Sequence, residues 1–170
     1  MQRSTLFDVL KVTRAPVIAS HSSARALVNH PRTMSDEMLR AMARNGGVVM
    51  VNFQDVFIDP RKIPPWHALF FAVSHLGWPD TPLAMLVDHI DHVVAVAGSD
   101  HVGLGSDFAG SFNMPAGMKD VAGFPNITAE LIRRGYSDDD VRKILGENVL
   151  REFSEVESLA GKGAAAESSN

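Results

Sequence analysis

Three apolar runs, separated by amphipathic stretches, dominate the hydrophobic pattern of this chain and predict buried strands. They lie at 16–21 (PVIASH), 47–53 (GVVMVNF) and 101–108 (HVGLGSDF), and each ends in polar residues. Strands that are apolar at nearly every position are typical of parallel sheets covered on both faces. The pattern therefore favours an α/β fold with parallel strands and flanking helices.

Periodic apolar positions and capping residues predict helices on either side of these runs. Leu6, Val9 and Leu10, for example, share one helical face near the amino terminus. The predicted helices run over 4–13, from the Ser35 N-cap to Gly46, from Thr81 and Pro82 to Gly98, from the Thr128 N-cap over 129–135, and from the Ser137 N-cap towards Phe153.

Two segments are predicted to be irregular. Residues 54–80 are rich in proline and are interpreted as a long excursion over the surface, and loops of that length are uncommon unless they are functional. Residues 159–170 lack apolar periodicity and are expected to form a disordered tail.

Polar side chains follow each predicted strand at its carboxyl end. They are His21, Asn52 and Asp107. In doubly wound sheets and in (β/α)8 barrels alike, ligands bind at the edge where the carboxyl ends of parallel strands meet. We therefore expect these three residues to lie at one rim and to mark a candidate site.

Each candidate residue also has a structural interpretation. His21 could be a core histidine satisfied by backbone groups or a metal or catalytic residue. A carboxylate at the end of a buried strand must be paired or ligating, which favours function for Asp107. Arg32 fits a plain surface residue. His89 and His92 have a spacing that can bind zinc, but the neighbouring Asp88 and Asp91 favour a solvated or supporting face.

Composition narrows the possible partners and sites. The 170 residues suggest one domain, and 16 basic against 20 acidic residues give a net charge of −4 without a basic cluster, so nucleic acid is not an expected partner. The chain has no cysteine, which excludes disulfides and thiolate ligands. It shows neither a signal-peptide core nor an apolar run long enough to cross a bilayer, so a cytoplasmic location is expected.

Three segments together resemble the carboxyl-terminal part of the membrane dipeptidase (renal dipeptidase) family of zinc peptidases. They are RAPVIASHSSARALVNHPRTMSDEMLRAMARNGGVVMVNF, DHIDHVVAVAGSDHVGLGSDFAG and FPNITAELIRRGYSDDDVRKILGENVLREF. The resemblance covers nearly everything from Thr13 to Val156. It implies that residues 1–158 form part of a metal-dependent-hydrolase-type (β/α)8 (TIM) barrel, contributing about three βα units, those of strands six, seven and eight.

The same resemblance implies an activity and roles for three residues. Family members hydrolyse dipeptides with two zinc ions, which are the implied cofactor. His21, in SHSS, corresponds to a zinc-ligand histidine. Arg32, in the PR pair, corresponds to the arginine that binds the substrate's free carboxylate, a task suited to a bidentate guanidinium. Asp107, in GSDF, corresponds to the catalytic aspartate that contacts the substrate amine and handles the proton.

Two features depart from the family pattern. The family usually carries an acidic residue where this chain has Ala109, in DFAG, which affects the hydrogen bonding expected in that loop. Family members are also considerably longer, and of the five zinc ligands expected only His21 has a counterpart here. A further ligand histidine would fall immediately before Met1.

Two functional hypotheses follow. In the first, the chain is the carboxyl-terminal part of a zinc dipeptidase that acts on small dipeptides and is inactive alone because most metal ligands are missing. In the second, it is a catalytically inactive, truncated binding or vestigial module of the same family. An in-frame histidine codon in the DNA just upstream of Met1 and, further back, codons for an H-x-D motif would favour the first. An open three-stranded sheet also leaves backbone groups unpaired at its edges, so a homo-oligomer is a possible state.

Overall fold

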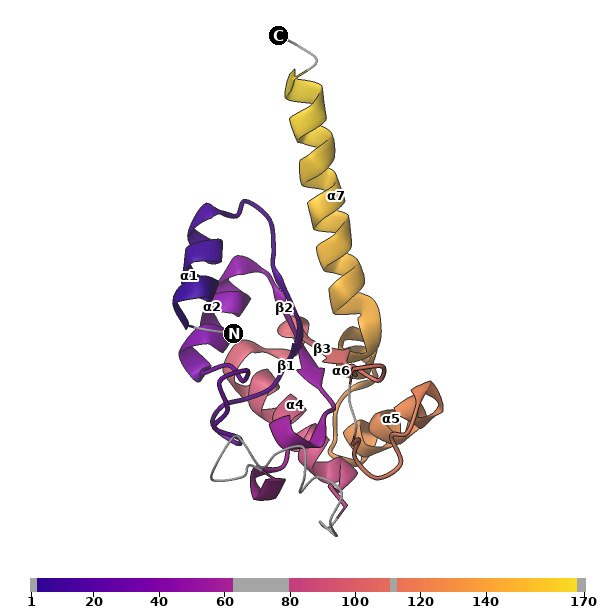
Figure 1. The fold of residues 1–170 in the computed structure, drawn as a ribbon. Helices are drawn as coiled ribbons and strands as arrows, with labels where there is room; N and C mark the ends of the chain where they lie inside the picture. Colours follow the sequence, from indigo (N-terminus) through magenta and orange to yellow (C-terminus); the bar gives the residue numbers. More distant parts are fainter. Residues whose placement is uncertain (1–2, 63–79, 111–112, 168–170) are drawn as a thin grey trace.

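The computed structural model describes residues 3–62, 80–110 and 113–167. These residues form a three-stranded sheet of β1 (Ile18–Ser22), β2 (Val48–Asn52) and β3 (Val102–Gly105), in the order β1-β2-β3 (Figure 1). Both pairings are parallel. The predicted α/β fold with parallel strands is therefore confirmed, and each strand lies within or one residue from its predicted run.

Helices flank and connect the strands. The α-helices are α1 (Arg3–Val12), α2 (Asp36–Asn45), α4 (Leu83–Ala97), α5 (Phe124–Arg133), α6 (Asp138–Arg142) and α7 (Asn148–Glu167). Short 3-10 helices lie at η1 (Asp55–Phe57), η2 (Pro60–Lys62), η3 (Ser99–His101) and η4 (Val121–Gly123). A kinked segment, η5 (Lys143–Glu147), with non-helical backbone at Gly146, joins α6 to α7.

Helix boundaries follow the predicted caps in part. Ser35 accepts a hydrogen bond from the Met38 amide, Ser137 does the same for Asp140, and Gly46 ends α2 with a φ of 82°. Two predicted caps are wrong. Pro82 is the N-cap of α4, because the Thr81 hydroxyl donates instead to Asp59 Oδ2 at 3.0 Å. Thr128 lies inside α5, which begins at Phe124 with a proline in its first turn.

The carboxyl-terminal helix differs from the expectation of a tail at 159–170. α7 continues to Glu167 and extends away from the other elements (Figure 1). The segment GAAAE near its end carries three alanines, and alanine has the highest intrinsic helix propensity. Helix formation does not require the apolar periodicity on which the prediction relied. Residues 168–170 lie outside the described residues.

The core lies between the sheet and the helices. α2 and α4 contact each other and both contact β2. Fully buried side chains from these elements include Met38, Met42, Val49, Val51 and Ile90. In β2, Val49 and Val51 are buried, whereas Met50 between them is partly exposed. None of the helices in the described ranges is both long and apolar enough to cross a membrane.

The sheet is curled so strongly that its two outer strands approach each other. A Cβ atom added at Gly105 in β3 would lie 2.2 Å from the Ser20 carbonyl oxygen of β1 and 3.0 Å from Met50 Cβ. Such distances are too short for any side chain, so glycine is required at this crossing. The curl brings the carboxyl ends of β1 and β3 together at one rim.

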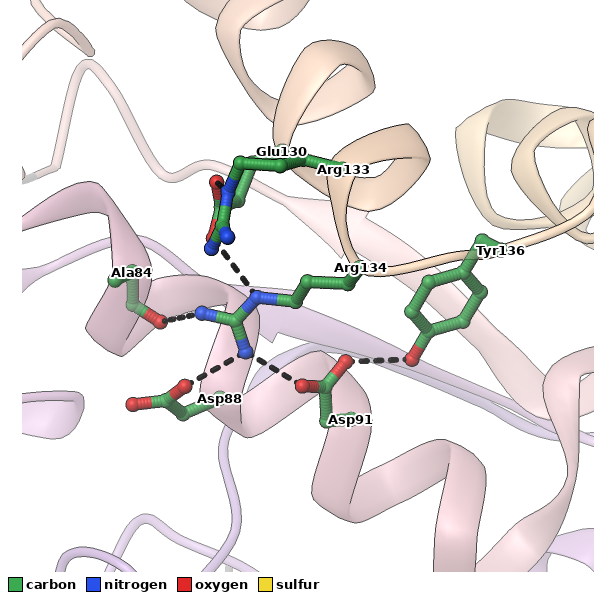
Figure 2. A network of polar contacts seen from close by, with 7 residues as sticks. All are labelled: Ala84, Asp88, Asp91, Glu130, Arg133, Arg134 and Tyr136. Carbon is green, nitrogen blue, oxygen red and sulfur yellow. Dashed lines mark hydrogen bonds and ion pairs between the residues drawn. The ribbon is translucent and has the colours of Figure 1, made fainter.

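A charged network fixes α5 against α4 (Figure 2). The Arg134 guanidinium donates to Asp88 and Asp91 on α4, to the Ala84 carbonyl and to Glu130 on α5. The Tyr136 hydroxyl donates to the other oxygen of Asp91 at 2.7 Å. Because the three guanidinium nitrogens are all engaged within the chain, the network is structural. It also explains the acidic residues beside His89 and His92.

Glu152 on α7 is a buried carboxyl group with an unsatisfied oxygen. Glu152 is 1% exposed, and its Oε2 atom has no hydrogen-bond partner among the described residues. Burial raises the pKa of Glu152 from 4.5 to about 7. The folded chain therefore holds this proton more tightly than the unfolded chain, and the contribution of Glu152 to stability falls as the pH rises from 4.5 to 7.

We expect Glu152→Gln to be more stable than the parent chain at pH 8 by about 3 kcal/mol, because glutamine never carries the buried charge. Below pH 4.5 the two chains should be similar. Urea unfolding at pH 8 and pH 4 measures both values. The exposed Glu157→Gln on the same helix is the matched control and should show no such difference. Equal stabilities of Glu152→Gln and the parent chain at pH 8 would contradict a buried charge at this position.

Candidate active site

His21 lies in a β-bulge at the carboxyl end of β1. Ala19 pairs with Val49 and Ser22 with Val51, so Ser20 and His21 lie opposite one residue of β2. Both side chains are exposed. His21 Nδ1 is hydrogen-bonded to Ser20 Oγ at 2.8 Å. When Nδ1 donates in this bond, Nε2 keeps its lone pair, as a metal ligand requires. Bulges often re-aim side chains beside active sites.

Arg32 lies at the end of a loop that returns to β1. The Ser22 hydroxyl donates to the Arg32 carbonyl at 3.0 Å. The Met34 amide donates to the Ser23 carbonyl and the Arg25 amide to the Met34 carbonyl, each at 2.8 Å. The side chain of Ser22, the residue after His21, therefore links β1 directly to the backbone of Arg32.

Phe57 supports the Arg32 side chain from the loop after β2. The Arg32 guanidinium carbon lies 5.2 Å from the centre of the Phe57 ring, within the range of a cation–π contact. The His30 ring packs on the same phenyl ring, with the centres 4.8 Å apart. Phe57 itself is buried. The exposed guanidinium is thus held over an apolar surface rather than extended into solvent.

The segment that carries Phe57 is buried, which corrects the prediction of a surface excursion for this part of 54–80. Residues 55–59 are all buried. Asp55 pairs with Lys62 at 2.7 Å, and Asp59 pairs with Arg61, also at 2.7 Å. Burial alone would raise the pKa of Asp59, but hydrogen bonds from Arg61 and Thr81 lower it below its ordinary value. Residues 63–79 lie outside the described residues.

His89 on α4 connects the loop that carries Arg32 to the loop that carries Phe57. Its Nδ1 accepts a hydrogen bond from the Ala24 amide at 3.0 Å, and Nε2 lies 3.3 Å from the Ile58 carbonyl. His92 Nε2 lies 2.8 Å from Asp36 Oδ1 and ties α4 to α2. Both histidines therefore have structural roles, as the sequence favoured. His89 fixes the loop that carries Arg32 relative to the loop that carries Phe57.

Acidification should weaken this connection. Burial lowers the pKa of His89 from 6.5 to about 4, so the unfolded chain binds a proton at a higher pH than the folded chain. Stability from neutral His89 is complete above pH 6.5 and is lost as the pH falls towards 4. We expect the stability advantage of the parent chain over His89→Gln to fall by about 3 kcal/mol between pH 7 and pH 4. Thermal unfolding of both chains measures it, and a constant difference would contradict a neutral His89.

Asp107 follows β3 in an unusual backbone conformation. Its φ is 58°, the only positive φ at a non-glycine residue of the described chain, and such conformations cluster at functional sites. Asn52 Nδ2 donates to Asp107 Oδ2 at 3.4 Å, while Asn52 Oδ1 accepts from the Gln54 amide at 2.6 Å. The second bond fixes the orientation of the amide, so its donor faces the carboxylate.

The turn after Asp107 closes without an acidic residue at position 109. The Gly110 amide donates to the Asp107 carbonyl at 3.0 Å, and Ala109 is exposed. A Cβ atom added at Gly110 would lie 2.5 Å from Asp107 Oδ1. Phe108 packs edge-on against Phe53, with the ring centres 5.9 Å apart. Backbone and aromatic contacts therefore stabilise the turn in place of the missing carboxylate.

The predicted rim is present, and two of its three residues are in contact. His21 and Asn52 lie at the carboxyl ends of β1 and β2, and Asp107 follows β3 by two residues. These strands are parallel, and Asn52 contacts Asp107. Within the described ranges, no interaction joins the His21 side chain to that of Arg32 or Asp107. The catalytic, substrate-binding and metal-ligand roles of these residues remain predictions.

The described residues supply a possible ligand for zinc but not a complete site. His21 has an exposed ring with one nitrogen oriented by Ser20. In the part of the chain that the structure describes, no group of three or more histidine, aspartate or glutamate residues is placed to hold a metal ion. A zinc site fixed by protein commonly needs at least three ligands. We therefore derive no hydrolytic step for these residues alone.

Sequence reasoning missed Phe57 and the support that its loop gives to Arg32. Val56, Phe57 and Ile58 form an apolar triplet between Asp55 and Asp59. This triplet indicates burial, but it lies next to a proline-rich stretch that is typical of a surface loop. No local signal could have shown that Phe57 meets Arg32, because the two residues come from loops after different strands.

The chain belongs to the membrane dipeptidase family, peptidase family M19. The model of that family matches residues 1–167. The match agrees with the resemblance drawn from the sequence, and it places this α/β chain among metallopeptidases.

The regions that match individual relatives include most of this chain but less than half of each relative. "Dipeptidase ataJ" of Aspergillus terreus is 38% identical over 157 residues, which are 92% of this chain and 35% of that protein. The crystal structure of the probable dipeptidase PvdM from Pseudomonas aeruginosa has a TM-score of 0.78 at 34% identity, covering 93% of this chain and 49% of PvdM.

A third relative was crystallised with a ligand. It is a metallopeptidase from Rhodobacter sphaeroides bound to a phosphinate mimic of the dipeptide L-Ala-D-Ala, with a TM-score of 0.73 and 28% identity. The similarity covers 90% of this chain and 40% of that one. The 170 residues therefore span between about a third and a half of the relatives that they match.

Proposed function

We propose that this chain forms the substrate-carboxylate side of a zinc dipeptidase site, with His21 as one zinc ligand, Arg32 as the carboxylate-binding residue and Asp107 as the residue that contacts the substrate amine. The substrates are small dipeptides with free ends. The observation that carries the proposal is the 3.0 Å hydrogen bond from Ser22 Oγ to the Arg32 carbonyl. It holds the carboxylate-binding arginine at a fixed place beside the residue that would ligate zinc.

Each residue has a chemical task that its surroundings support. Arg32 is exposed, and a guanidinium can bind a carboxylate with two parallel hydrogen bonds. Asp107 is held by Asn52 in a conformation fixed by the backbone, and a carboxylate there can accept hydrogen bonds from an ammonium group. When bound, the zinc ions act as Lewis acids on the peptide carbonyl and activate the attacking water.

A second candidate is a non-catalytic binding module of the same family. The observation that favours it is the absence of a metal-binding cluster among the described residues. Such a module would keep the carboxylate-binding loop without hydrolysing its ligand. Zinc-dependent turnover separates the two candidates.

The proposed role of Arg32 is tested in an enzyme with a complete site. We define the chimera as a protein in which the part of the Rhodobacter sphaeroides metallopeptidase that this chain does not match precedes residues 1–170. In the chimera, Arg32→Gln should raise KM for a dipeptide by about a hundredfold, because losing a charged pair to a carboxylate costs roughly 2 to 3 kcal/mol.

The matched substrate control is the same dipeptide with a carboxyl-terminal amide, for which Arg32→Gln should change kcat/KM by less than about threefold. The matched protein control is Arg44→Gln, at an exposed arginine at the end of α2. An equal loss for the dipeptide and its amide would show that Arg32 does not bind the substrate carboxylate.

A further inference from the structure

Arg25 lies in the same loop as Arg32, and its side chain is turned back onto that loop. Its Nη2 donates to the Thr33 carbonyl, with a longer contact of 3.5 Å to the Pro31 carbonyl. These carbonyl groups belong to the residues immediately before and immediately after Arg32. Nε of Arg25 is buried and has no partner among the described residues. The Arg25 guanidinium therefore faces the backbone of the loop.

The two peptide groups that flank the Arg32 Cα atom are both held. On the amino side, the Pro31 carbonyl faces Arg25, and the Arg32 amide donates to His30 Nδ1 at 3.1 Å. On the carboxyl side, the Arg32 carbonyl accepts from Ser22 Oγ, and the Thr33 amide donates to the His30 carbonyl at 3.0 Å. With both peptide planes fixed, the direction of the Arg32 side chain from its Cα atom is fixed as well.

The far end of the Arg32 side chain is held separately, by the Phe57 ring. A long side chain pays a large entropic cost when a ligand orders it. Fixing its backbone and placing its guanidinium over the Phe57 ring before substrate arrives removes part of that cost, which is the general basis of preorganised binding.

We propose that Arg25 is a positioning residue that holds the backbone around Arg32 and so prepares its guanidinium to bind a substrate carboxylate. The inference rests on the proposed function for the role of Arg32, but the contacts between Arg25 and the loop are independent of it. The proposed role requires no contact between Arg25 and substrate or metal. Its effect on activity passes entirely through Arg32.

The first arm of the test measures the loop itself by amide hydrogen exchange. In the 170-residue chain, Arg25→Gln should raise the exchange rates of the Arg32 and Thr33 amides by about tenfold or more, because the loop then opens more often. The Leu39 amide in α2 should be unchanged, which shows that the loss is local. Arg14→Gln, at an exposed arginine outside the loop, is the control.

The second arm measures substrate binding in the chimera with a double-mutant cycle. Arg25→Gln should raise KM for a dipeptide by about tenfold with kcat within about threefold, and should add less than about twofold when Arg32 is already glutamine. Arg25→Lys keeps one donor and should restore part of the loss.

The two arms separate failure of this inference from failure of the proposed function. Unchanged exchange at Arg32 and Thr33 in Arg25→Gln would overturn the inference, and so would additive effects of Arg25→Gln and Arg32→Gln on KM. If Arg32→Gln leaves KM unchanged while Arg25→Gln still increases loop exchange, the proposed function of Arg32 fails, and Arg25 is left as a residue that only orders the loop, which also overturns the inference.

Discussion

A polypeptide of these 170 residues alone should hydrolyse dipeptides at least about a thousandfold more slowly than the chimera when both are supplied with zinc. The reason is the ligand count. Activation of water takes a metal fixed by about three protein ligands with an open position, and the described residues contain no cluster of three. One imidazole, that of His21, cannot retain zinc against water and buffer.

The comparison needs four proteins and a chelator. The chimera should lose nearly all activity on His21→Ala and on chelation, whereas its His92→Ala variant should keep its activity, because His92 bonds Asp36 between two helices. Chelator-sensitive turnover by the 170-residue polypeptide would overturn the argument. His89 and His92 would then be the first residues to examine as ligands, although both ring nitrogens of His89 and Nε2 of His92 already have partners.

Replacement of Gly105 by alanine should cost about 3 kcal/mol in the free energy of unfolding, the upper part of the usual range for overpacking. The added Cβ atom would lie 2.2 Å from the Ser20 carbonyl oxygen. That oxygen belongs to the backbone of β1, so relief requires a strand to move. Because Ser20 precedes His21, the displacement should also reach the candidate site.

Chemical denaturation of the parent chain and two variants tests this expectation. Gly161→Ala is the matched control, because nothing lies within 4 Å of its added Cβ atom and alanine stabilises a helix relative to glycine by roughly 0.5 to 1 kcal/mol. A loss below about 0.5 kcal/mol for Gly105→Ala would show that β1 and β3 are not in contact at this point.

The sequence was sufficient for features that depend on local chemistry. The runs of apolar residues located all three described strands, and Ser35, Gly46 and Ser137 marked helix ends because their capping bonds reach only a few residues along the chain. The rim containing His21, Asn52 and Asp107 followed from the parallel arrangement alone. The proposed roles of these residues came from resemblance rather than from pattern.

Features that depend on long-range contacts could not be predicted. Threonine is a residue type that commonly caps helices, but the Thr81 hydroxyl donates its hydrogen bond to Asp59, which is far away in sequence. The bulge at Ser20 and His21 depends on how β1 pairs with β2. Phe57 supports Arg32 only because His89 and the ion pair between Asp55 and Lys62 fix its loop. In each case the deciding partner is not visible in the local sequence.

A crystal structure of the zinc-loaded chimera with a phosphinate dipeptide mimic would show directly whether His21, Arg32 and Asp107 form one dipeptide-binding site. We expect zinc about 2.1 Å from His21 Nε2, the inhibitor's carboxylate on the Arg32 guanidinium with two hydrogen bonds, and its amine beside Asp107. An inhibitor whose carboxylate is bound elsewhere, or zinc held without His21, would contradict it.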